Sequence, residues 1–178
     1  MESKGAMRRT FKTDEELSPR EMVQYGLDHM GAGFYLFRDR PEFYDSAGYL
    51  MHIGYECLLK GWWLELDKEI HAEHDLIKIS KKIPAFHYDC LKPEFKKTIS
   101  MINSFQNLRY PNLINPIEIG NQILEPILEL VRFTLLSIPA EIRPEEKSDH
   151  IKKGNRILMK KPIMSVAKKK VAAKKKAA

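Results

Sequence analysis

The sequence predicts an all-α protein: a bundle of about five helices followed by a basic tail. Apolar residues recur every three or four positions in five separate segments, which is the spacing of one face of a helix. No stretch shows sustained period-two alternation, and no Asn-Gly pair marks a hairpin turn. A chain of 178 residues with 43% apolar composition is also long enough to bury the core of one domain.

The first predicted helix begins at Ser18, after a charged and aperiodic segment, residues 1–17, that is expected to be a flexible lead-in. Ser18 is placed to cap the helix, Pro19 suits its first position, and Glu21 completes a capping box. Gly31 and Gly33 favour close approach of a neighbouring helix. The helix carries a mostly apolar stripe, formed by Met22, Tyr25, His29, Ala32 and Leu36.

A second helix, from Pro41 to about Leu66, is predicted to be central because its apolar face is unusually wide. That face comprises Phe43, Ala47, Leu50, Met51, Gly54, Tyr55, Leu58 and Trp62. On another side His52, Glu56 and Lys60 follow one another at intervals of four, and Glu56 and Lys60 stand in the order that favours an ion pair. We interpret this row as a solvent-exposed face.

Three further helices complete the predicted bundle. The third is short and amphipathic and ends before Pro84, with a stripe of Leu76, Ile79 and Ile83. The fourth is marked by Phe95, Ile99, Ile102 and Phe105, and it ends before Pro111, which disfavours helical geometry at Tyr110. The fifth is very apolar, is expected to kink at Pro126, and runs from Ile117 to Ile138. The packed body is therefore predicted to span residues 18–142.

Charge is distributed unevenly along the chain. Residues 151–178 contain eleven Lys or Arg and no Asp or Glu, whereas residues 1–150 contain 19 basic and 24 acidic residues, a net charge of −5. The segment 143–178 is predicted to be a charged linker and a disordered Lys/Ala-rich tail. Such a tail attracts RNA or DNA through counterion release. The alternative is a solvated tail that only aids solubility.

The sequence favours a cytoplasmic protein. Cys57 and Cys90 are too few for a disulfide framework, which fits a reducing compartment, and Cys57 is expected to pack as a small apolar residue. No apolar run approaches the roughly 18 residues of a membrane span. The N-terminal residues lack the apolar region of a signal peptide, so no membrane association is expected.

The run GYLMHIGYECLLKGWWLEL, the following HDLIKISKKI, and the later LRYPN resemble, in this order, HEPN domains (higher eukaryotes and prokaryotes nucleotide-binding). The resemblance covers roughly residues 20–138. It implies an up-and-down helical bundle, commonly a homodimer, of the kind found in toxin–antitoxin systems, in partners of small nucleotidyltransferases and in RNA-processing proteins.

Catalytic HEPN proteins resemble one another in an arginine that is followed, after four to six residues, by a histidine, and this pair cleaves RNA. Arg109 matches the arginine, but the residues after it, YPNLINPIEIG, contain no histidine. The remaining Arg-Tyr-Pro pattern resembles members thought to bind nucleotides or partners. Arg143 and His150 satisfy the spacing, but they lie among acidic residues beyond the predicted bundle.

Two interpretations of Arg109 remain open. It caps the end of the fourth helix, where a cation is favoured, or it binds a phosphate while Tyr110 stacks on a base. Spacing along the chain does not exclude a catalytic histidine from elsewhere in the fold. The histidines that could approach Arg109 are His52, His71, His74 and His87, and His74 is the candidate selected. For His74 and Asp75, capping of the third helix is the competing interpretation. His71 and His74 with Glu73 form only a weak metal-site pattern.

The sequence thus leads us to expect a non-catalytic nucleic-acid- or nucleotide-binding protein without a cofactor or bound metal. The alternatives are a metal-independent endoribonuclease that uses Arg109 with a distant histidine, and an interaction module that pairs with a nucleotidyltransferase or a toxin. The predicted binding residues are Arg109, Tyr110, Asn112, Lys168, Lys169, Lys170, Lys174, Lys175 and Lys176.

Overall fold

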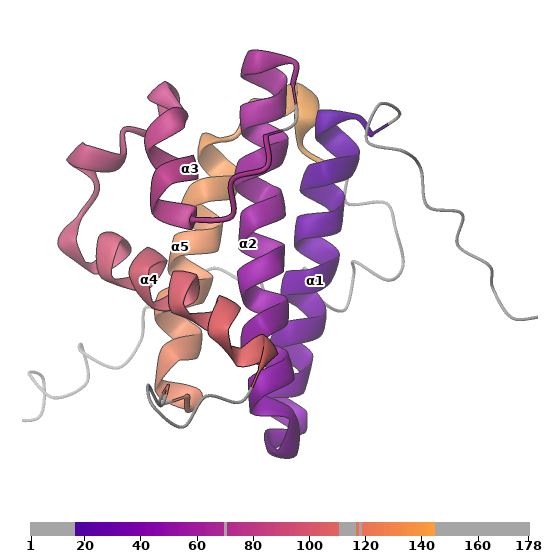
Figure 1. The fold of residues 1–178 in the computed structure, drawn as a ribbon, viewed down its shortest axis with the longest axis vertical. Coiled ribbons are helices and arrows are strands. Elements are labelled where there is room, and N and C mark those ends of the chain that lie inside the picture. Colours follow the sequence, from indigo (N-terminus) through magenta and orange to yellow (C-terminus); the bar gives the residue numbers. More distant parts are fainter. Residues whose placement is uncertain (1–16, 70, 111–116, 118, 145–178) are drawn as a thin grey trace, which may run out of the picture.

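The structure is a computed structural model that describes residues 17–69, 71–110, 117 and 119–144. Every regular element in those residues is a helix, which confirms the predicted helical bundle (Figure 1). The α-helices are α1 (Pro19–Asp39), α2 (Tyr44–Asp67), α3 (Leu76–Lys82), α4 (Pro93–Ser104) and α5 (Leu124–Ser137). Short 3-10 helices lie between and after them: η2 (Pro41–Phe43), η3 (Pro84–Phe86), η4 (Tyr88–Cys90), η5 (Phe105–Arg109), η6 (Asn121–Ile123) and η7 (Ala140–Ile142).

Helices α1 and α2 form a long pair, and α2 is the central helix, as its wide apolar face predicts. The capping box that starts α1 is present in both halves: Glu21 N–H donates to Ser18 Oγ at 3.2 Å, and Ser18 N–H donates to Glu21 Oε2 at 3.0 Å. On the side of α2 away from α1 lie α3 and α4, and α5 packs behind them (Figure 1). Tyr55 and Trp62 of α2 are fully buried in the resulting core.

Glycines allow α1 and α2 to pack closely. A Cβ added at Gly26 would lie 2.7 Å from the carbonyl oxygen of Gly54, and one added at Gly33 would lie 3.0 Å from that of Ala47. Gly33 therefore has the role that the sequence predicts, and Gly26 has the same role. Such close contact between the two backbones fixes the axial position of α1 relative to α2.

The fifth helix is shorter than predicted and does not begin at Ile117. Gly120 is extended and η6 intervenes, so α5 starts at Leu124. Pro126 consequently lies in the first turn of α5 instead of its interior. A proline in the first turn removes an N–H that has no partner within the helix, so Pro126 is tolerated there and breaks no hydrogen bond of the helix interior.

The packed body includes Ile142 of η7, which is buried, and the predicted boundary after this residue stays a prediction. The predicted lead-in, the linker beyond Pro144 and the tail lie outside the described residues. Among the residues that the structure describes, no helix combines the length and the apolar character needed to cross a bilayer.

Candidate functional site

A pocket of about 660 Å³ opens beside α2, where the start of α3 meets the end of α4. Helix α2 contributes four of its lining residues, among them His52 and Glu56, and His74 comes from the residues just before α3. The rest belong to η5 and the residue after it: Gln106, Asn107, Arg109 and Tyr110. The fold thus brings Arg109 to the same pocket as two histidines that are distant from it in the sequence.

Glu56, in the pocket wall, contacts three basic side chains: His52, Lys60 and His74. Its Oε1 lies 2.9 Å from Lys60 Nζ and 2.9 Å from His74 Nδ1, while its Oε2 lies 3.5 Å from His52 Nε2. The Glu56 and Lys60 side chains are only 12% and 11% exposed. The interpretation of His52, Glu56 and Lys60 as a solvent-exposed face is therefore wrong, because the segments leading into α3 and out of α4 cover this side of α2.

Burial of Glu56 by itself raises the pKa of its carboxyl group. Hydrogen bonds from His52, Lys60 and His74, together with the charge of Lys60, outweigh this effect and lower the pKa to about 2. Glu56 is therefore ionised at neutral pH and acts as a fixed anion that orients three basic side chains.

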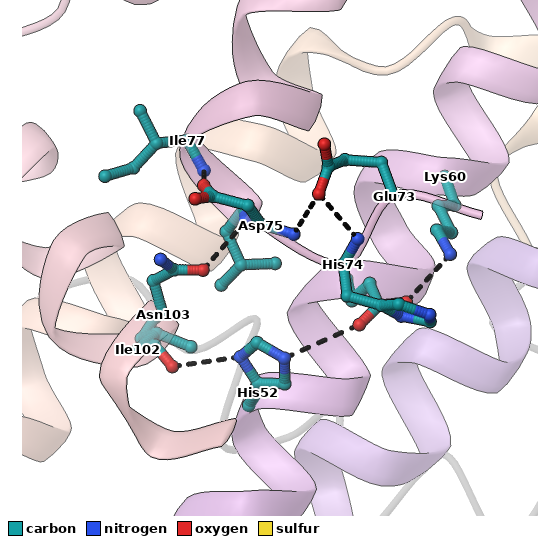
Figure 2. A network of polar contacts seen from close by, with 10 residues as sticks. His52, Lys60, Glu73, His74, Asp75, Ile77, Ile102 and Asn103 are labelled. Carbon is teal, nitrogen blue, oxygen red and sulfur yellow. Dashed lines mark hydrogen bonds and ion pairs between the residues drawn. The ribbon is translucent and has the colours of Figure 1, made fainter. Parts of the chain in front are cut away.

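His52 connects the pocket wall to α4. Its side chain is 4% exposed, and its Nδ1 lies 3.1 Å from the carbonyl oxygen of Ile102. Since the two ring nitrogens face Ile102 and Glu56, the imidazole is held between α4 and α2 (Figure 2). His52 positions the wall and offers little surface to a ligand.

His74 is presented to solvent by a well-bonded segment before α3. Asp75 caps α3 by accepting from the N–H groups of Ile77 and Lys78, and Glu73 accepts from those of His74 and Asp75 at 3.0 Å each. Capping by Asp75 is confirmed. The imidazole of His74 has a different role: it is 68% exposed, and its Nδ1 pairs with Glu56.

Arg109 and Tyr110 form the outer edge of the pocket. Both are exposed, and the guanidinium carbon of Arg109 lies 5.3 Å from the centre of the Tyr110 ring. Within the described part of the chain, the Arg109 guanidinium has no ion pair and no hydrogen bond. The bond that closes η5 joins Tyr110 N–H to the Asn107 carbonyl and does not involve the Arg109 side chain. Arg109 lies in the last turn of η5, where a cation is favoured, but no capping hydrogen bond from its side chain is seen within the described residues. Both interpretations of Arg109 therefore stay open.

His71 and His74 have separate partners. The His71 ring stacks on Trp63 with centres 3.9 Å apart, and its Nε2 lies 3.2 Å from Asp67 Oδ2. Among the residues that the structure describes, no three His, Cys, Asp or Glu side chains gather as a metal site.

Arg143 directly follows η7, and its side chain reaches back to the end of α5. Its Nε donates to the carbonyl of Ile138 at 2.7 Å, and its NH2 group donates to that of Leu136 at 2.8 Å. These bonds cap the carbonyl end of α5, which gives Arg143 a structural role. Its candidate partner His150, together with Asn112 and the six tail lysines, lies outside the described residues, so those assignments stay predictions.

Sequence reasoning named His52 only as one of four histidines that could approach Arg109, and it did not select Glu56, Gln106 or Asn107 as site residues. The spacing of four between His52, Glu56 and Lys60 was visible, but it is equally typical of an exposed helix face. Only the covering of α2 by the segment before α3 and the end of α4 distinguishes the alternatives.

Comparisons of this chain with family models, with curated proteins and with solved structures found no match.

Proposed function

We propose that this chain is an HEPN-like protein that binds nucleic acid or a nucleotide, with a phosphate at Arg109 and a base against Tyr110. The observation that carries the proposal is the shared pocket, which is lined by His74, by the exposed Tyr110 ring and by the Arg109 guanidinium, which has no ion pair with any described residue. A guanidinium donates paired hydrogen bonds to phosphate, and an aromatic face accepts any base by stacking.

The remaining lining residues suit the same ligand. Gln106 and Asn107 offer amide groups that match the hydrogen-bonding edges of an unpaired base. A volume of about 660 Å³ is within the usual range for small-molecule pockets. The basic tail supplies additional, sequence-independent attraction to a nucleic acid in this proposal.

A fluorescent mononucleotide and a labelled RNA test the proposal in binding titrations with the full chain. Arg109→Ala is expected to weaken both by about tenfold or more, since hydrogen bonds to a charged group contribute about 1.5–3 kcal/mol. Arg109→Lys is expected to restore only part of the affinity, because lysine lacks the planar pair of donors. Arg38→Ala, an exposed arginine of α1 that pairs with Asp39, is the control. Equal binding by wild type and Arg109→Ala contradicts the proposal.

A second candidate, RNA cleavage, is favoured by one observation: Glu56 holds His74 Nδ1, which directs Nε2 away from the carboxylate. In this mechanism Nε2 takes the proton of a ribose 2′-hydroxyl, the resulting oxygen attacks phosphorus, and Arg109 stabilises the added charge. The 5′-oxygen leaves with a proton from solvent, and a 2′,3′-cyclic phosphate remains.

Gel analysis of the same labelled RNA separates the two candidates. Binding without chemistry predicts intact RNA with the wild-type chain. Fragments ending in a cyclic phosphate that disappear in both Arg109→Ala and His74→Ala establish cleavage instead. Fragments that persist in both variants come from a contaminating nuclease.

A further inference from the structure

Positive and negative charges are segregated in the described part of the molecule. Residues 76–110, which contain α3 and α4, carry seven Lys or Arg and two Asp or Glu, a net charge of +5. The other described residues, 17–69, 71–75, 117 and 119–144, carry seven Lys or Arg and fourteen Asp or Glu, a net charge of −7. Since α3 and α4 lie together on the side of α2 away from α1, the positive charge is concentrated on one side of the bundle (Figure 1).

The pocket lies at one end of the α3–α4 pair. There the Leu76 N–H, at the start of α3, donates to Asn103 Oδ1, near the end of α4, at 2.8 Å (Figure 2). The start of α3 therefore lies against the end of α4. His74 directly precedes this junction, and Arg109 follows it by a few residues.

A cluster of cations lies at the opposite end of the pair. The ammonium groups of Lys81, from α3, and Lys96, from α4, lie 5.5 and 5.8 Å from the centre of the same Tyr88 ring. Lys96 Nζ also donates to the carbonyl of Asp89 at 2.7 Å. Two lysines from different helices thus contact one aromatic ring, and Lys81 and Tyr88 also line a second hollow of about 260 Å³.

The two ends are separated by the length of α4. Its 12 residues span about 18 Å at 1.5 Å per residue. From Phe95 to Tyr110 the sequence contains no Asp or Glu, while Lys97 and Ser100 are exposed along the way. We define the α3–α4 basic face as Lys78, Lys81, Lys82, Lys92, Lys96 and Lys97.

We propose that the α3–α4 basic face binds the phosphodiester backbone of a single-stranded nucleic acid whose terminal base occupies the pocket. This inference rests on the proposed function and adds the class of ligand: an oligonucleotide that reaches from Arg109 to the Lys81–Tyr88–Lys96 cluster. A cationic surface contacts the backbone without reading sequence. The strand is single because the base at Tyr110 must be unstacked and unpaired.

Affinity as a function of ligand length tests the inference. The ligands are a mononucleotide, a dinucleotide, a tetranucleotide and an octanucleotide, as oligouridylate and as oligothymidylate. The protein is the full chain in which the six lysines Lys168, Lys169, Lys170, Lys174, Lys175 and Lys176 are replaced by serine. The test variant in this background is Lys81→Gln/Lys96→Gln, and the matched control is Arg38→Gln/Lys68→Gln, two exposed cations outside the basic face.

The test variant is expected to bind the octanucleotide about tenfold more weakly and to bind the mononucleotide unchanged. Loss of two phosphate contacts lowers the slope of log affinity against log salt by about 1.4. The control is expected to change neither quantity. Circular dichroism verifies that each variant is folded. Binding of either sugar series supports the inference, and the difference between the series identifies the preferred sugar.

Three outcomes overturn the inference. The first is that the test variant and the control bind ligands of every length with the same affinity. The second is that the test variant loses as much affinity for the mononucleotide as for the octanucleotide. The third is that an octaglutamate peptide competes for the protein as well as the octanucleotide does. If the proposed function itself is wrong, a different result is expected: Arg109→Ala in the same background then leaves the affinity for the mononucleotide unaltered.

Discussion

At the scale of single residues, Glu56 determines how the pocket wall is built. A carboxylate that is 12% exposed requires compensation, and the chain provides it from two sources: His52 and Lys60 on its own helix, and His74 from the segment before α3. The contact with His74 links residues 18 positions apart. Removal of Glu56 would leave these basic groups without their shared anion.

Glu56→Gln is expected to reduce stability at pH 7 by about 1–3 kcal/mol, the range for a partly buried ion-pair network. The pKa of Glu56 in the folded chain is about 2 and its ordinary value is 4.5. The stabilisation is thus complete above about pH 4.5 and is lost as the pH falls toward 2. Urea unfolding at several pH values from 7 to 2 measures both effects.

Glu56→Gln is expected to lose less stability than wild type as the pH falls from about 4.5 toward 2, because it lacks the carboxyl group that becomes protonated. Glu65→Gln serves as control, because Glu65 is on the same helix but more exposed, at 35%, and pairs only with Lys68 in the described residues. Parallel pH profiles for Glu56→Gln and wild type would show that the contacts seen at Glu56 do not stabilise the fold.

At the scale of elements, the contact between α1 and α2 depends on the absence of side chains at a few positions. A Cβ at Gly54 would lie 2.8 Å from the backbone nitrogen of Met30 and 2.9 Å from the carbonyl oxygen of Gly26. A Cβ at Gly48 would meet only side chains, the nearest being the tip of Leu108 at 2.5 Å. Backbone atoms of a packed helix cannot move aside independently, whereas a leucine side chain can rotate.

Gly54→Ala is therefore expected to destabilise the fold by about 1–3 kcal/mol, despite the roughly 1 kcal/mol by which alanine improves helix propensity. Gly48→Ala is expected to cost less, because the Leu108 tip can yield. Thermal unfolding of the two variants beside wild type gives the comparison. If Gly54→Ala were as stable as wild type, the two helices would not be as close as the structure has them.

At the scale of the whole molecule, the basic tail and the α3–α4 basic face are two separate sources of positive charge on a body that is otherwise acidic. Deletion of residues 151–178 removes eleven cations and no anion. We expect weaker binding of nucleic acid and a shallower salt dependence, since each lost phosphate contact reduces the slope by about 0.7 for single strands. Titrations at several salt concentrations check this, and an unchanged slope would assign the tail a role in solubility alone.

The sequence by itself determined the helical class, the capping box at Ser18, the central position of α2 and the end of α3 before Pro84, because these follow from local periodicity and from backbone chemistry within a few residues. It did not locate the start of α5. The apolar run from Ile117 to Ile138 is equally compatible with one continuous helix and with a helix that begins only after the extended Gly120 and η6. The tertiary structure alone decided that Glu56 is buried and that His74 and Arg109 share a pocket. Burial and proximity depend on which segments cover α2, and residues separated by 35 positions carry no local signal of meeting.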